Sequence, residues 1–265
     1  MIYDIDPASV LFLDIETVSE KATLGELSDQ FQDLWRIKAH QLSRRDPETE
    51  ALSEEELGAE YRERAAIYAE FGKIVCISVG FLHRQQPDEP YVLRLKSYYG
   101  PDEEKLLNEF CALIEKSYRQ PETGNRYDPP RFYFCGHNLR EFDLPYICRR
   151  MLVHGLRFPP SLQLAGKKPW QLEHLLDTME LWKFGDRKHF SSLHMLATVL
   201  GFTSPKSAMD GSQVGVAFWE GQAYDEIARY CERDVLATTQ LFLRYRLDDL
   251  LEESAQVISL TFDPA

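Results

Sequence analysis

The stretch Val10-Leu11-Phe12-Leu13-Asp14-Ile15-Glu16-Thr17, near the beginning of the chain, decides the fold. Its four leading apolar residues predict a short buried strand that ends directly at Asp14. Asp14 and Glu16 are two residues apart, so in extended chain their side chains point the same way. A buried, unpaired carboxylate is costly, and a metal ion would offset that cost. A solvated surface pair is the commoner case in a chain with 43 acidic residues, so this pair needs support from elsewhere.

A second acidic segment follows another predicted strand, Arg131 to Cys135. The chain continues as His137-Asn138, and Asp143 comes within the first turn of a helix predicted from Phe142 to His154. Helix capping by Asn138 or Asp143 would explain these residues without any catalytic role.

A third segment lies on the long amphipathic helix predicted from Tyr224 to Leu251. Tyr230 and Asp234 are four residues apart and therefore share one face of that helix. Ile227, Val235 and Leu241 place apolar groups nearby, so a polar pair at the edge of an apolar stripe is the ordinary alternative.

Together the three segments resemble the DEDDy subgroup of the DnaQ-like 3′-5′ exonucleases, which share a ribonuclease-H-like fold. The family's motifs are D-x-E, N-x₃-F-D and Y-x₃-D, and the matching residues are Asp14 and Glu16, then Asn138, Phe142 and Asp143, then Tyr230 and Asp234. The related DEDDh subgroup has a histidine shortly before the last aspartate, and this chain has none between His194 and Asp234. The resemblance is greatest to stand-alone exonucleases similar to the proofreading domain of family-B DNA polymerases.

The resemblance implies a two-metal-ion mechanism with Mg²⁺ or Mn²⁺. It implies that Asp14 bridges both ions, that Glu16 and Asp234 hold the ion that activates water, and that Asp143 serves the second ion. The resemblance also implies that Tyr230 hydrogen-bonds the attacking water. A phenol with a reference pKa of about 10 is a poor base at neutral pH, so we expect it to orient the water. Hard divalent ions prefer carboxylate oxygen, and four carboxylates would balance the charge of two such ions.

Substrate contacts are expected from His137, Asn138 and Phe142, which follow the strand into the site. A purely structural turn at His137 and Asn138 is the alternative. For Asp177, in a further segment similar to the family, we favour a cap on the following turn over a catalytic role.

The order of predicted elements indicates an α/β fold, a ribonuclease-H-like mixed five-stranded sheet flanked by helices. We expect a single exonuclease domain spanning 1–265, with a helical insertion at about 25–68 in which Ser53 and Glu56 form a capping box. The strands are predicted at 10–13, 73–82, 91–98 and 131–135, with a short strand or helix within 170–183; the other helices are predicted from 101 and over 192–200.

Composition narrows the class of protein. Five scattered cysteines without a C-x-x-C pair argue against a disulfide framework or a zinc site. No apolar run approaches the ~20 residues of a membrane helix, and we expect a soluble cytoplasmic protein that has no membrane partner. The net charge of −13 repels phosphate, which favours a short footprint on nucleic acid with metal cations at the point of contact.

Several weaker signals lie between the second and third segments. Basic side chains there could hold a single-stranded phosphate backbone, although solvated surface positions are the more frequent explanation. Interleaved aromatic side chains could stack on bases or pack in the core. The basic residues are Lys167, Lys168, Arg187 and Lys188, the aromatic residues are Trp170, Trp182, Phe184 and Phe190, and a polar loop over 204–211 could close over the substrate.

The leading interpretation is an exonuclease that removes nucleotides from the 3′ end of single-stranded DNA. An exoribonuclease of the same fold is the first alternative, because DNA and RNA are distinguished by contacts to the 2′-OH that these motifs do not reveal. A non-catalytic nucleic-acid-binding module is the second alternative, and the presence of all four carboxylates disfavours it. Protein partners are not indicated by the sequence.

Overall fold

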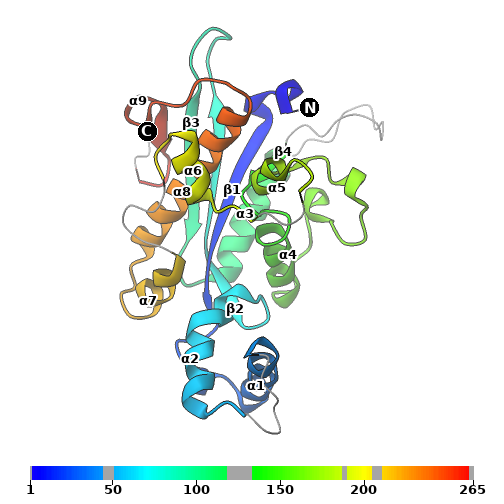
Figure 1. Cartoon of the computed structure of the whole chain (residues 1–265), viewed down its shortest axis with the longest axis vertical. Helices are drawn as coiled ribbons and strands as arrows, with labels where there is room; N and C mark the ends of the chain where they lie inside the picture. Colours follow the sequence, from blue (N-terminus) through cyan, green and yellow to red (C-terminus); the bar gives the residue numbers. More distant parts are fainter. Residues whose placement is uncertain (1, 44–50, 118–132, 187–189, 205–210, 263–265) are drawn as a thin grey trace.

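The computed structural model describes residues 2–43, 51–117, 133–186, 190–204 and 211–262. One mixed sheet with the strand order β5-β4-β1-β2-β3-β6 lies between helices (Figure 1). Its strands are β1 (Val10–Ser19), β2 (Gly72–His83), β3 (Val92–Tyr99), β4 (Tyr133–Gly136), β5 (Leu175–Asp177) and β6 (Val257–Ser259). The predicted ribonuclease-H-like α/β class is confirmed. The sheet has six strands instead of five, because β6 pairs in parallel with β3.

Nine α-helices and seven short 3₁₀ helices accompany the sheet in the described part of the chain. The α-helices are α1 (Asp29–Ser43), α2 (Glu54–Arg64), α3 (Glu103–Ser117), α4 (Asp143–Val153), α5 (Thr178–Lys183), α6 (Leu193–Leu200), α7 (Val214–Trp219), α8 (Tyr224–Tyr245) and α9 (Glu253–Gln256). The 3₁₀ helices are Ile2–Asp4, Pro7–Ser9, Leu24–Glu26, Ala65–Ile67, Pro160–Leu162, Pro169–Gln171 and Gly211–Gln213.

β1 continues well beyond Asp14, so the expectation that the strand ends there is wrong. The antiparallel ladder with β2 extends through Asp14, opposite Ser78, and Glu16, opposite Cys76, before a register shift after Glu16. The parallel ladder with β4 covers only Val10 to Phe12 on β1. β1 therefore loses its β4 neighbour just before Asp14, and this places the D-x-E segment at the open end of the parallel pair.

The two faces of the sheet are covered by different helices. α8 packs on one face, where Phe242 meets Phe12 of β1 with ring centroids 5.4 Å apart. α3 and α4 pack on the other face, where Phe110 and Ile147 join Leu13 in the largest apolar cluster. Since side chains alternate along β1, Phe12, Asp14 and Glu16 share the side that faces α8.

A buried ion pair fastens α4 to α3 and to the end of β1. The Arg150 guanidinium reaches Glu103 with N···O distances of 2.6–3.1 Å, and it also donates to Glu20 and to the backbone oxygen of Ala69. Glu103 also accepts the backbone N–H of Ile74 on β2 at 2.7 Å. This network therefore ties the chain just after β1, at Glu20, and the start of β2, at Ile74, to α3 and α4.

α1 and α2 lie between β1 and β2 in the sequence and form a lobe at one end of the molecule (Figure 1). Their own apolar cluster is centred on Trp35 and Tyr61, whose rings meet edge to face. The predicted capping box is confirmed, since Ser53 and Glu56 exchange side-chain to backbone hydrogen bonds. α1 begins at Asp29 and α2 ends at Arg64, both within the predicted insertion at about 25–68.

α8 also ends earlier than predicted, at Tyr245 instead of Leu251. The chain turns at Leu247, which has a φ of 59°. The Gln240 side chain then bonds both backbone groups of Leu251, which holds the returning segment against the helix. The predicted helix over 192–200 is confirmed as α6, closed by Gly201 in the left-handed conformation. Among the helices of the described residues, none combines the length and the apolar character of a membrane span.

Candidate active site

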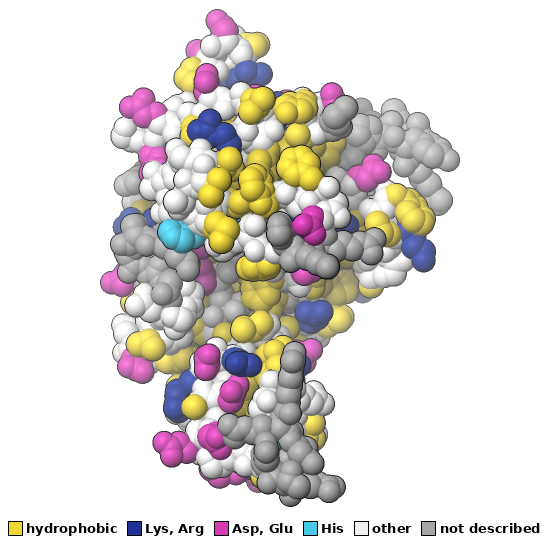
Figure 2. Space-filling view, viewed as in Figure 1, with side chains coloured by type: hydrophobic (Ala, Val, Ile, Leu, Met, Phe, Trp, Pro, Cys, Tyr) yellow, Lys and Arg dark blue, Asp and Glu magenta, His cyan; other side chains and the backbone are white. Residues whose placement is uncertain are grey.

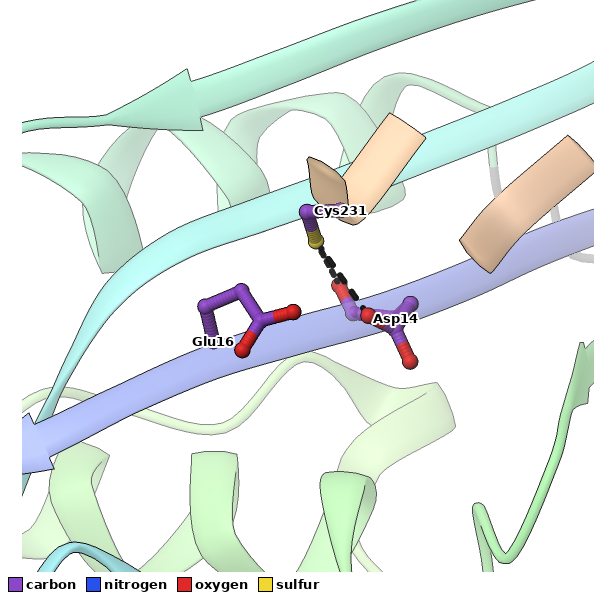
Figure 3. A group of neighbouring side chains, drawn as sticks. All are labelled: Asp14, Glu16 and Cys231. Atoms are coloured by element: carbon purple, nitrogen blue, oxygen red, sulfur yellow. Dashed lines mark hydrogen bonds between the residues drawn. The ribbon is translucent and has the colours of Figure 1, made fainter. Parts of the chain in front are cut away.

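The centre of the site is formed by β1 and the middle of α8. One donor atom each from Asp14, Glu16 and Cys231 lies within 4.8 Å of the others, a spacing compatible with a shared metal ion (Figure 3). The Cys231 thiol donates to the backbone oxygen of Asp14 at 3.4 Å and approaches its Oδ2 at 3.3 Å. Strand β1 and helix α8 are therefore joined directly at the acidic segment.

Tyr230 and Asp234 reach the same region from α8. Both are on the helix face that packs against β1 and β2, and Tyr230 belongs to the apolar cluster that contains Val18 and Cys231. The Tyr230 phenol donates a hydrogen bond to Asp234, and burial together with Asp234 and Glu16 raises the Tyr230 pKa. A phenol that keeps its proton can orient a ligand, but it cannot act as a base at neutral pH.

Asp143 enters from the first turn of α4. Its side chain is 3% exposed, and burial is the main reason that its pKa rises to about 7. The charges of Asp177 and Asp234 raise this pKa further, whereas backbone N–H groups of Asp143 itself and Ile15 oppose the shift. The Ile15 contact places the Asp143 carboxyl beside β1.

The carboxylates perturb one another strongly. Burial is the largest cause that raises the Asp14 pKa, followed by the charges of Asp234, Asp143 and Glu16. The Glu16 pKa is raised by burial first and then by Asp234. All four acids of the three sequence segments thus lie close enough for their charges to interact.

The donor set of the cluster fits a divalent cation. Glu16 is 8% exposed, and no described residue donates a hydrogen bond to its carboxylate. Mutual repulsion and burial both disfavour the ionised acids, and a cation among them would reverse both effects. Carboxylate oxygens are the ligands that Mg²⁺ and Mn²⁺ prefer.

The turn before α4 is held by Asp177. Its Oδ1 accepts the backbone N–H groups of Asn138, Met179 and Glu180, and its Oδ2 accepts that of Arg140. Asp177 therefore caps α5, as we favoured from the sequence, and it also connects the end of β5 to the turn after β4.

Of the residues expected to contact the substrate, the side chains of His137 and Phe142 contact other protein groups, whereas that of Asn138 is only partly engaged. Both ring nitrogens of His137 are engaged, one with the Thr178 hydroxyl at 2.9 Å and the other with the Ser191 backbone oxygen at 2.8 Å. Asn138 adopts a φ of 68°, and its buried Oδ1 has no hydrogen-bond partner among the described residues. Phe142 packs on Tyr146 with ring centroids 5.5 Å apart.

A family model described as predicted 3′-5′ exonucleases related to the exonuclease domain of PolB matches residues 67–256. The chain belongs to this family. The PolB-related exonuclease match includes Asp143, Tyr230 and Asp234, whereas Asp14 and Glu16 precede its first residue. A search of curated proteins finds no match to the chain.

Cys231 is the residue of this candidate site that sequence reasoning missed. The scattered cysteines argued against a disulfide framework or a zinc site and indicated no role for Cys231, which is fully buried. Its position gave one signal, since it directly follows Tyr230 and precedes Asp234 by less than one helical turn. Burial raises the pKa of the Cys231 thiol, and a neighbouring Cys76 thiol raises it further.

The interleaved aromatic residues of the sequence analysis divide into two groups. Phe184, Phe190 and Trp170 are 90%, 71% and 69% exposed, so core packing is wrong for these three. Trp182 stacks on Tyr245 at 6.2 Å between ring centroids. Apolar side chains gather visibly on the face of the molecule seen in Figure 2.

The basic residues and the loop of the weaker predictions are described only in part. Lys168 is exposed and Lys167 is half-buried. Arg187 and Lys188 lie outside the described residues, as does 205–210 of the loop that we expected to close over the substrate.

Proposed function

We propose that this protein is a divalent-metal-dependent exonuclease that hydrolyses single-stranded DNA from its 3′ end. The observation that carries the proposal is the cluster of Asp14, Glu16, Asp143 and Asp234, in which the charges of neighbouring acids raise the pKa values of Asp14, Glu16 and Asp143. Membership of the PolB-related exonuclease family supports the reaction class. The presence of a tyrosine at 230 favours the DEDDy subgroup.

The four carboxylates would hold two Mg²⁺ or Mn²⁺ ions. Bound there, the ions would acidify a water molecule and stabilise charge on the attacking and leaving oxygens. Asp14 is central, since its pKa is raised by all three other acids, which suits a ligand shared between ions. Glu16 and Asp234 would complete one position, and Asp143 would serve the other from the α4 side.

Tyr230 would orient the attacking water through its phenolic O–H. Its raised pKa keeps the proton in place, and its hydrogen bond to Asp234 fixes the ring beside the carboxylates. This geometry supports a positioning role and disfavours a role as general base.

Asn138 and Phe142 would contact the terminal nucleotide, and His137 would support them. The unpartnered Oδ1 of Asn138 offers an acceptor to a substrate hydroxyl. His137 would contribute by holding the turn, because both of its ring nitrogens are engaged by the protein. The exposed rings of Phe184 and Phe190 could stack on unpaired bases, which favours a single strand over a duplex.

The proposal is tested on 5′-labelled single-stranded DNA and RNA of equal length, with Mg²⁺, with Mn²⁺ or with EDTA. We expect a ladder of shortening labelled DNA products in either metal and none in EDTA. A faster ladder on RNA would favour the exoribonuclease. Direct release of the labelled 5′ nucleotide would contradict the 3′-to-5′ direction.

A further inference from the structure

Cys231 introduces a sulfur atom into an otherwise oxygen-rich cluster. In a tetrahedral zinc site, a sulfur and an oxygen ligand lie about 3.5 Å apart. The Sγ of Cys231 already lies 3.3 Å from Oδ2 of Asp14. The donor atoms of Asp14, Glu16 and Cys231 are all within 4.8 Å of one another, so contraction by about 1.5 Å at most would place them around one ion.

Glu16 adds a second observation that points to a cation at this point. Its side chain is more than nine-tenths buried, and no described residue donates a hydrogen bond to it. Figure 3 shows the Glu16 carboxylate turned toward Asp14 and the Cys231 thiol. A buried carboxylate without a donor costs free energy unless a cation approaches it.

We propose that Asp14, Glu16 and Cys231 form a mixed oxygen–sulfur site for a thiophilic divalent cation, with Zn²⁺ as the representative ion. The Cys231 thiol loses its proton to solvent as the sulfur–metal bond forms. Two carboxylates and one thiolate then supply three ligands, and a fourth position stays open for water, as in zinc sites with three protein ligands.

This site shares Asp14 and Glu16 with the carboxylate cluster. It rests on the proposed function only in that these two acids belong to both sites. Mg²⁺ is a hard ion that gains little from sulfur, whereas thiolate ligands select zinc-like ions. Zn²⁺ would therefore compete with Mg²⁺ for Asp14 and Glu16 and would inhibit hydrolysis.

The test uses Cd²⁺ as the probe and the full chain as the protein. We expect an ultraviolet thiolate-to-cadmium charge-transfer band that saturates at one Cd²⁺ per chain. Cys231→Ser should abolish the band, while Cys148→Ser, which removes a half-buried thiol of α4, should retain it. Glu16→Gln should weaken Cd²⁺ binding at least about tenfold and keep the band at saturation.

Three results would overturn the mixed site. They are a band unchanged in Cys231→Ser, a band lost only in Cys76→Ser, and Cd²⁺ binding unchanged in Glu16→Gln. Should Cys231→Ser fail to fold by circular dichroism, the ¹¹³Cd NMR shift of the wild-type chain decides between one sulfur ligand and oxygen ligands alone. Cd²⁺ binding through Cys231 without nucleotide release in Mg²⁺ or Mn²⁺ would overturn the proposed function and leave this site standing.

Discussion

The Asp177 carboxylate accepts the backbone N–H of Asn138 at 3.0 Å, although the two residues are 39 positions apart in the sequence. The same carboxylate accepts the N–H of Arg140, so the end of β5 fixes the turn that leads into α4. Because Asp143 begins α4, Asp177 helps to set the position of a proposed metal ligand without being one itself.

Replacing Asp177 by alanine should lower the free energy of unfolding by about 2–4 kcal/mol, because it leaves several N–H groups without an acceptor. Asp177→Asn should lose less, since its amide oxygen can still accept at one end. Urea denaturation measures both values. Wild-type stability in Asp177→Ala would show that the turn does not depend on this carboxylate.

The buried Arg150–Glu103 ion pair should contribute more to stability than an ion pair at the surface. Arg150→Met keeps most of the volume but removes the guanidinium from the buried Glu103, which then retains only the His154 ring and the Ile74 N–H, so it should cost about 3–5 kcal/mol. Arg36→Met is the matched control, because Arg36 forms ion pairs with Asp33 and Glu54 at the surface. That control should cost at most ~1 kcal/mol. Equal losses in the two variants would contradict the account of the α3–α4 connection.

The pKa of Asp143 makes the metal-free protein sensitive to pH. The folded protein keeps the Asp143 proton up to about pH 7, whereas an unfolded aspartate loses it near pH 4. The folded state thus binds more protons in this window, so stability falls as pH rises through it. Melting temperatures in EDTA should drop between pH 5 and pH 8.

Asp143→Asn should reduce that drop, and saturating Mg²⁺ should reduce it in the wild-type chain. A melting temperature that rises with pH in EDTA would contradict the raised pKa of Asp143. The raised pKa values of Asp14 and Glu16 act in the same direction, so some of the drop should persist in Asp143→Asn.

Tyr230→Phe tests orientation against base catalysis. Loss of the O–H should lower kcat roughly 10- to 100-fold with little change in KM, because the attacking water is less well placed. The pH–rate profile should keep its shape, since the raised pKa leaves Tyr230 protonated throughout the assay range. A basic limb present in the wild type and absent from Tyr230→Phe would favour the phenol as a base.

The sequence predicted most of the sheet because its strands are apolar and bounded by clear breaks. It failed where pairing partners decide the outcome. β1 extends past Asp14 because β2 continues to pair with it, and the three-residue β6 exists because it pairs with β3. α8 was predicted six residues too long, since Leu250 and Leu251 pack against the helix without continuing it.

The acidic residues of the candidate site could be predicted from the sequence, whereas the residues around them could not. Asp14, Glu16, Asp143 and Asp234 follow spacing rules that a sequence displays directly. Cys231 contacts Asp14 across 217 positions of sequence, which no local pattern reveals. Glu232, in the same segment, accepts instead from the Ser97 hydroxyl of β3, so proximity in sequence to Asp234 does not place an acid in the site.

The most direct measurement is nucleotide release from the 3′ end of 5′-labelled single-stranded DNA by the wild-type chain and Asp234→Asn, side by side in Mg²⁺. Removing one ligand charge from the cluster should lower release at least ~10³-fold, because several kcal/mol of charge stabilisation depend on it. The variant should still fold, since the change relieves repulsion among buried acids. Stepwise shortening by the wild type and none by the folded variant is the predicted result. Release at the wild-type rate by Asp234→Asn would contradict the account.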